Sequence, residues 1–281
     1  GKNTLFFQTE DGKKIPAEHL PEEEVKKIYY PFGRDKAFDK YEGDDTTFIA
    51  EILPGLYYIA MGYDSTDDGP VFSDGLMAWV KEHTEKAKEK GATVICSTHR
   101  PIVTPSPAYK IMGKGHTFAD GEKRIKELAD MGVRLFFSGH THIQYMGEFV
   151  SEKGNKLYDI CTATTVGTPG KYRKIEIAED GTMNVKSINV EGFSLPDEFK
   201  TAEEFFDWRF KYSVKNKINK ILEGGSGFVR VLKQFGGKVL NSIKLKTIAR
   251  LLFIKIDSSL KNVKLMDFVG EIATAIFKGD M

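Results

Sequence analysis

Cysteine is scarce in this sequence, with only two residues in 281, Cys96 and Cys161, both inside apolar runs typical of strands. A disulfide-stapled scaffold needs many more, so that class is excluded and we expect two reduced core cysteines, which leave the compartment open. Long apolar stretches are also missing. The strongest, Ile248–Ile256, is short and broken by Arg250 and Lys255, whereas a membrane-spanning helix needs about 20 apolar residues.

A signal peptide is not visible at Gly1-Lys2-Asn3, although a leading glycine followed by sequence typical of a domain interior suggests a trimmed start. An excess of one charge is missing too, since 41 Lys and Arg stand against 40 Asp and Glu. Whole-chain charge therefore indicates neither a nucleic-acid-binding protein nor an acidic tail. With 41% hydrophobic residues, the composition is that of a globular protein of one large or two modest domains.

The charge is distributed unevenly along the chain. Residues 195–281 carry 16 basic and 10 acidic side chains, a net of +6, whereas residues 1–194 carry 25 and 30, a net of −5. Gly224–Ile256 holds seven Lys or Arg and no Asp or Glu. We place a domain boundary at this change in composition, dividing the chain into residues 1–194 and a C-terminal region, 195–281.

The N-terminal part alternates between strand and helix patterns and predicts a mixed α/β fold. Apolar, β-branched runs predict strands at 46–52, 56–61, 93–96 and 133–137. Amphipathic spacing predicts one helix capped by Ser73 and Asp74 and a second that begins near Asp120 and ends at Gly132. Four further runs joined by polar turns predict an antiparallel meander: 143–150, 157–163, 172–178 and 183–190.

The C-terminal region has a different pattern, which predicts helices over 198–222, 228–256 and 265–277. Two interpretations of its acid-free segment stay open. A basic amphipathic helix can lie on an anionic membrane or bind a partner helix. Alternatively, its apolar face packs on the rest of the protein. Aromatic residues do not alternate with the charges there, so nucleic acid is not an expected partner.

Two histidine clusters follow two of the predicted buried strands. His99 comes after the strand at 93–96, and His140 and His142 come after the strand at 133–137. One helix separates the strands, and such a crossover leaves them parallel, so both loops emerge at the same sheet edge. Neutral imidazoles suit transition metals. We expect Gly139 to provide a sharp turn, with extended backbone pointing His140 and His142 to the same side; the alternative is that each histidine is an ordinary core or surface residue.

These residues resemble the calcineurin-like metallophosphoesterase family. Gly139-His140-Thr141-His142 matches its Gly-His-x-His signature, His99-Arg100-Pro101 matches the upstream His-x-Pro block, and the similar region runs roughly from Thr46 to Val190. The resemblance implies a β-sandwich flanked by helices. It also implies two divalent transition-metal ions (Mn, Fe, Zn or Ni) that polarise a phosphate mono- or diester and activate a hydroxide. By motif, His99 and His140 would bind one metal and His142 the other.

The sequence departs from the family in its remaining ligands. The upstream Asp-x-His, Gly-Asp-x-x-Asp and Gly-Asn-His-Asp or Glu motifs do not occur in the chain. The resemblance therefore implies a domain truncated at its N-terminus that holds one metal or none and has little activity. Unpaired strands would then favour a homodimer or a bound N-terminal fragment.

Two further residues are candidates for binding the phosphoester, Arg100 through a phosphate oxygen and His116 from the loop between the clusters. A surface salt bridge of Arg100 is the alternative. A non-catalytic protein with at most a weak three-histidine metal site is the rival to the enzyme.

Overall fold

The structure is a computed structural model of all 281 residues. It describes residues 6–9, 11, 13–16, 20–31, 33–104, 116–178, 180–224, 242–251 and 253–279. Within these ranges, helices that are long and apolar enough to cross a membrane are not found.

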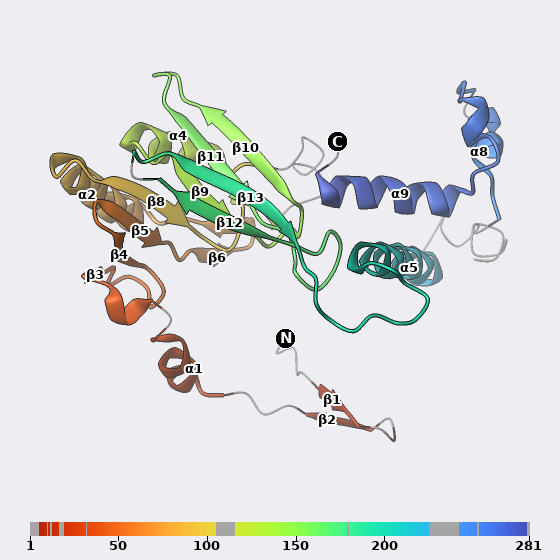
Figure 1. Ribbon diagram of the computed structural model, residues 1–281, viewed down its shortest axis with the longest axis horizontal. Coiled ribbons are helices and arrows are strands. Elements are labelled where there is room, and N and C mark those ends of the chain that lie inside the picture. The colour runs from red at the N-terminus through yellow and green to blue at the C-terminus, as the bar shows by residue number, and fades with distance from the viewer. Residues whose placement is uncertain are drawn as a thin grey trace.

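A seven-stranded mixed sheet forms the centre of the protein, in the order β10-β11-β9-β8-β5-β4-β3 (Figure 1). The four strands β11, β9, β8 and β5 are mutually parallel, and the outer ones run antiparallel to their neighbours. The predicted parallel crossover from β8 to β9 is therefore confirmed. The strands are β3 (Asp39–Lys40), β4 (Phe48–Leu53), β5 (Leu56–Ala60), β8 (Thr93–Ser97), β9 (Leu135–Ser138), β10 (Tyr145–Val150) and β11 (Lys156–Cys161).

Two amphipathic helices cover one face of this sheet, α2 (Asp74–Glu89) and α4 (Gly121–Met131). The hydroxyl of Ser73 caps α2 by accepting from the N–H of Leu76 at 3.1 Å, and Gly132, with φ of 97°, ends α4, as the sequence predicts. The core between helices and sheet consists of fully buried side chains from both layers, among them Phe72, Val80, Leu128, Val133, Phe136 and Leu157. Cys96 and Cys161 are buried and unbridged, as expected.

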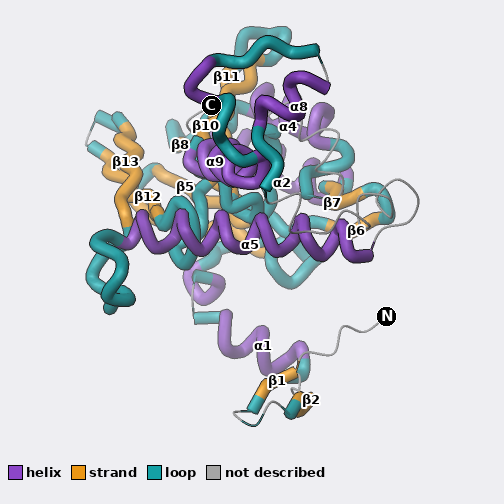
Figure 2. The backbone as a smooth tube through the Cα atoms, turned by 90° about the vertical axis from the view of Figure 1, so that its right-hand side faces the viewer, coloured by secondary structure: helices purple, strands orange, loops and turns teal. Residues whose placement is uncertain are grey.

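Two antiparallel hairpins of the predicted meander are confirmed, but the pairing that would join them into one sheet is wrong. The last two strands, β12 (Lys171–Ile177) and β13 (Met183–Asn189), pair only with each other, and Figure 2 shows them on the side of the sheet opposite α2 and α4. The physical reason is that β11 has both edges occupied, by β10 on one side and by parallel β9 on the other. Turn residues specify local hairpins, but they do not specify which strand takes a free edge.

Smaller elements surround this centre and do not contribute to the large sheet. They are β1 (Phe6–Gln8), β2 (Lys14–Pro16), α1 (Glu22–Tyr29), the 3₁₀ turn η1 (Arg34–Lys36), β6 (Asp64–Thr66) and β7 (Gly69–Val71). In Figure 1 the β1–β2 hairpin and α1 lie away from the sheet.

The C-terminal region contains α5 (Ala202–Gly224), α8 (Leu245–Leu251), the 3₁₀ turn η2 (Ser258–Leu260) and α9 (Leu265–Lys278). The helix predicted through Ile256 ends earlier, at Leu251, because Phe253 adopts a left-handed φ of 55°. The earlier part of that prediction, residues 228–241, lies outside the described residues. Residues 190–201 form no helix or strand; the domain division near Leu195 stays a prediction.

The C-terminal helices attach to the sheet close to the second histidine cluster. The N–H of Gln144 donates to the carbonyl oxygen of Phe277 in α9 at 3.0 Å. Lys278 forms ion pairs with Glu203 and Asp207 of α5, at 2.6 and 2.7 Å. These contacts attach the C-terminal end of α9 to Gln144, which follows His142 by two residues in the sequence.

Gly279 tests this attachment. It caps α9 with φ of 76°, and a Cβ there would overlap the carbonyl oxygen of Gln144, so we expect Gly279→Ala to detach α9. Gly181→Ala is the matched control, because φ is 81° there but nothing lies within 4 Å. Both substitutions carry about 1–2 kcal/mol of left-handed backbone strain. Limited proteolysis should cleave the C-terminal region faster in Gly279→Ala alone; equal cleavage in both variants would contradict the docking.

Candidate functional site

The rings of His99 and His140 lie in contact at the carboxyl edge of the sheet. Each follows its parallel strand, β8 or β9, by two residues. Nδ1 of His140 is 3.0 Å from Nε2 of His99, and the ring centroids are 4.9 Å apart at an interplanar angle of 76°. Two residues that are 41 positions apart in the sequence are therefore brought together, and the crossover topology is the cause.

His116 extends this pair to a row of three imidazoles. Its Nδ1 lies 3.0 Å from Nε2 of His140, so that both ring nitrogens of His140 face another imidazole. His142 makes no ring contact with the row among the described residues, but its charge influences the pKa of both His99 and His140. The structure thus groups His99, His140 and His116 most closely, with His142 nearby. Their roles as metal or substrate ligands stay a prediction.

The expected backbone of the second cluster is wrong. His140 and His142 are not extended: both adopt left-handed conformations, with φ of 62° and 59°. Gly139 does not provide the turn, since it has no positive φ and a Cβ would make only ordinary contacts there. These two left-handed non-glycine positions, which flank Thr141, cost about 1–3 kcal/mol each. Such strain persists where the surrounding structure holds the loop.

The surroundings of His99 and His140 favour their neutral forms. Burial first, and then the nearby charges of Arg100, His99, His116 and His142, lower the pKa of His140 to about 4. Burial, followed by the charge of Arg100, also lowers the pKa of His99. At neutral pH these imidazoles therefore have free lone pairs, the form that binds a metal.

The side chain of Arg100, which follows His99 directly in the sequence, contacts the aromatic residue Tyr63. Its Nε donates to the hydroxyl of Tyr63 at 3.2 Å, and the guanidinium lies 5.7 Å from the centre of that ring. This places a permanent positive charge beside the histidines. An anion is the ligand class that such a charge favours.

Asp159 is the residue that the sequence analysis missed. It is fully buried on β11, and its carboxylate accepts from the N–H groups of Ile102 and Val103 at 2.7 and 2.9 Å and from the hydroxyl of Ser138 at 2.6 Å. One carboxylate therefore fastens the loop that carries His99 to the strand end that precedes His140. The available signal was an aspartate inside the apolar run 157–161.

Burial raises the pKa of Asp159 to about 6, although its three hydrogen bonds act in the opposite direction. Burial disfavours a charged carboxylate, whereas donors stabilise it. The Asp159 carboxylate that holds the site is therefore ionised at neutral pH, even though its burial disfavours the charged form.

The remaining described histidine, His83, is engaged elsewhere. Its Nε2 lies 2.9 Å from the carboxylate of Asp39, and its ring packs on Trp79 with centroids 4.3 Å apart. It belongs to the buried face of α2 and does not join the imidazole row.

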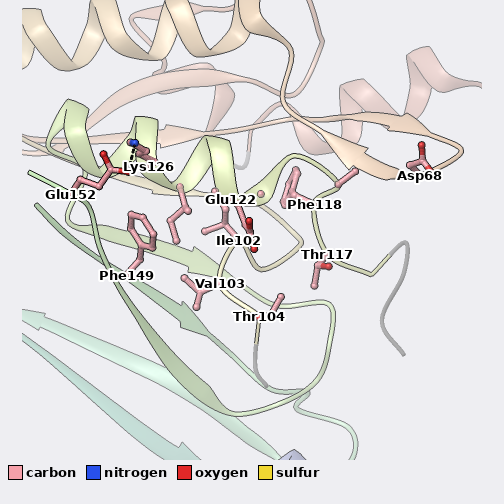
Figure 3. Close-up of a pocket in the computed structure, with 13 residues that line it drawn as sticks. Asp68, Ile102, Val103, Thr104, Thr117, Phe118, Glu122, Lys126, Phe149 and Glu152 are labelled. Atoms are coloured by element: carbon pink, nitrogen blue, oxygen red, sulfur yellow. Dashed lines mark hydrogen bonds and ion pairs between the residues drawn. The ribbon is translucent and has the colours of Figure 1, made fainter. Parts of the chain in front are cut away.

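A cavity of about 760 Å³ lies beside the loop that Asp159 fixes, and Ile102, Val103 and Phe118 line it (Figure 3). At one end of the cavity Lys126 forms an ion pair with Glu152 at 2.8 Å. None of the described histidines lines it. Its rim carries the carboxylates of Asp68, Glu122 and Glu152 against one lysine, a charge balance that repels a phosphoester anion. We therefore place the candidate site at the histidines.

The donor set fits a cation only in part. Two ligands about 2.1 Å from a cation and at right angles lie about 3 Å apart, which is the separation between Nδ1 of His140 and Nε2 of His99. Across the described residues, however, no group of three or more His, Cys, Asp or Glu is arranged to hold a metal. Two imidazoles are in place; a third ligand is not.

Comparisons with known proteins give a distant structural likeness. No family model matches the sequence, and no curated protein matches it. Among solved structures, the chain is similar to a dimetal phosphatase from Danio rerio, at 12% identity and a TM-score of 0.43, over 58% of this chain and 64% of that one. The chain thus spans less than two thirds of that phosphatase.

The raised pKa of Asp159 predicts how this site depends on pH. A folded-state pKa of about 6, above the ordinary 3.8, means that the folded protein holds this proton more tightly than the unfolded chain. Its contribution to stability is therefore largest at low pH and is lost as pH rises through about 6. Between about pH 7 and about pH 5, wild type should gain about 1 kcal/mol of unfolding free energy over Asp159→Asn.

Urea unfolding at the two pH values measures the difference in unfolding free energy between wild type and Asp159→Asn. Titrating groups that both proteins share cancel from this difference. Asp130→Asn is the matched control. Asp130 also accepts from two side chains, but those hydrogen bonds lower its pKa to about 2. Its difference from wild type should not change over this range. An Asp159→Asn difference that is equally flat would contradict the charged, buried carboxylate.

Proposed function

We propose that this chain carries part of a metal-dependent phosphoesterase site, acting on phosphate mono- or diesters. The observation that supports this most is the contact between His99 and His140 at the ends of two parallel strands joined by one helix. The Gly-His-x-His and His-x-Pro motifs supply the same residues.

The residues take the following roles in this proposal. His99 and His140 hold one divalent cation, and His142 approaches a second one. A bound transition metal (Mn, Fe, Zn or Ni) supplies Lewis acidity and lowers the pKa of a water molecule. Arg100 binds a phosphate oxygen from its place against Tyr63. His116, in contact with His140, lies where it can move a proton to or from the bound phosphoester.

The same proposal extends to the architecture. We assign the β12–β13 hairpin, on the far side of the sheet from α2 and α4, to the second layer of the family's β-sandwich. The helical region from Leu195 onward is an addition to that fold. A second copy of the chain, or another chain, would cover the open strand edges.

One observation favours the non-catalytic alternative. Among the described residues, no group of three or more His, Cys, Asp or Glu could hold a metal, so the acidic ligands of a two-metal site are not assembled around the rings of His99 and His140. In this alternative the histidines bind one metal weakly or none, and the chain acts through its surfaces.

Metal binding tests the site. Zn²⁺ or Mn²⁺ titrated into the purified chain and followed by calorimetry should give at most one cation, and His140→Ala should weaken its affinity at least about tenfold, because the central imidazole is lost. His19→Ala is the control, since it removes an imidazole distant in the sequence. Equal weakening by both substitutions would contradict the assignment.

Activity separates the two functions. We expect this chain alone to turn over bis-p-nitrophenyl phosphate weakly or not at all, since the carboxylate motifs are missing from the sequence. Two tightly bound metals together with rapid turnover would show that the site is complete. Metal binding lost in His140→Ala but without any turnover would favour the non-catalytic alternative.

A further inference from the structure

Phe253 is the most exposed large apolar side chain among the described residues. Its side chain is 97% exposed, and the next, Val166, is 70% exposed. Its neighbour Ile254 is 56% exposed. Adjacent exposed phenylalanine and isoleucine side chains leave a large apolar area in water, which is unfavourable for the isolated protein.

The backbone at Phe253 is strained as well. The N–H of Ile254 donates to the carbonyl oxygen of Ala249 at 2.8 Å, which closes α8 with a Schellman-type cap, and Phe253 occupies its left-handed position at φ of 55°. Glycine is the usual residue there. A bulky side chain costs about 1–2 kcal/mol more. Within the described structure, burial of the ring does not offset this strain.

Phe253 and Ile254 form an exposed apolar apex within a basic segment of the chain. The segment 242–264 carries six Lys or Arg, with Asp257 as its only acidic residue, a net charge of +5. None of the six forms an ion pair with another described residue, and Asp257 accepts from Ser259 instead. The basic residues are Lys244, Lys246, Arg250, Lys255, Lys261 and Lys264.

The fold gathers these charges instead of dispersing them. The N–H of Leu245 donates to the carbonyl oxygen of Val263 at 2.9 Å, and an antiparallel bridge sets Lys244 directly opposite Lys264. Like charges opposite each other destabilise a pair of strands. Contact with an anionic surface would relieve this repulsion between the two lysines, and this relief would favour binding.

The apex lies at one end of the molecule. Figure 1 shows α8 projecting beyond α9, on the side away from the sheet.

We propose that the segment 242–264 is a membrane-docking surface that binds anionic lipid headgroups. Phe253 and Ile254 insert into the interfacial layer of the bilayer, and the surrounding lysines and Arg250 contact the headgroups. Exposed apolar side chains within a basic segment are the combination that interfacial binding uses. This proposal is independent of the phosphoesterase site.

The test is sedimentation of the full chain with vesicles, either pure phosphatidylcholine or phosphatidylcholine with about a quarter phosphatidylserine. We expect binding to the anionic vesicles only, weakened by salt. Phe253→Gly should reduce it at least about fivefold. Because glycine relieves the backbone strain, this variant should be as stable as wild type or more so, and lost binding cannot come from unfolding.

Two further variants complete the design. Lys264→Glu should also weaken vesicle binding at least about fivefold, while removing the repulsion with Lys244. Val166→Ser, a change at another exposed apolar position, should bind as wild type does. Equal binding to neutral vesicles, unchanged binding of Phe253→Gly, or no sedimentation of wild type would each overturn the proposal. Capture of wild type by an acidic protein without any vesicle binding would overturn it in favour of a protein partner.

Discussion

The candidate site depends on one buried carboxylate. Asp159 lies on β11, two strands from β8, and accepts hydrogen bonds from the loop after β8 and from Ser138 at the end of β9. Without it, the buried N–H of Ile102 and the part-buried N–H of Val103 would lose their acceptor. A buried unsatisfied group costs about 1–3 kcal/mol. The same hydrogen bonds fix the positions of the loops that carry His99 and His140, and thus determine whether the two rings meet.

This constraint explains the unusual features nearby. Two left-handed histidines are tolerated because both ends of their loop are fixed, by β9 before them and by the contact of Gln144 with α9 after them. Burial, together with the nearby cationic charges, lowers the pKa values of His99 and His140 and keeps these imidazoles neutral. The strained backbone at His140 and His142 and the lowered pKa values of His99 and His140 are typical of a ligand-binding site. A metal cation or an anion is the candidate ligand.

Sequence reasoning found the elements with local signals and missed those with distant causes. The caps at Ser73 and Gly132, the parallel β8–β9 crossover and the histidine loops could all be predicted, because spacing and chain topology determine them. The separation of β12–β13 from the sheet depends on competition for the edges of β11, which a single sequence does not reveal. Asp159 was missed because its partners are more than 20 residues away in the sequence. The left-handed histidines follow from that distant constraint.

The most direct test of this account is the protonation of His140, followed by NMR of its ring nitrogens as pH is lowered. If His140 lies half-buried between His99 and His116 beside Arg100, its pKa should be about 4, and it should remain neutral when an exposed histidine is fully charged. An ordinary titration near 6.5 would mean that the rings do not meet. The two histidine loops would then not form one site.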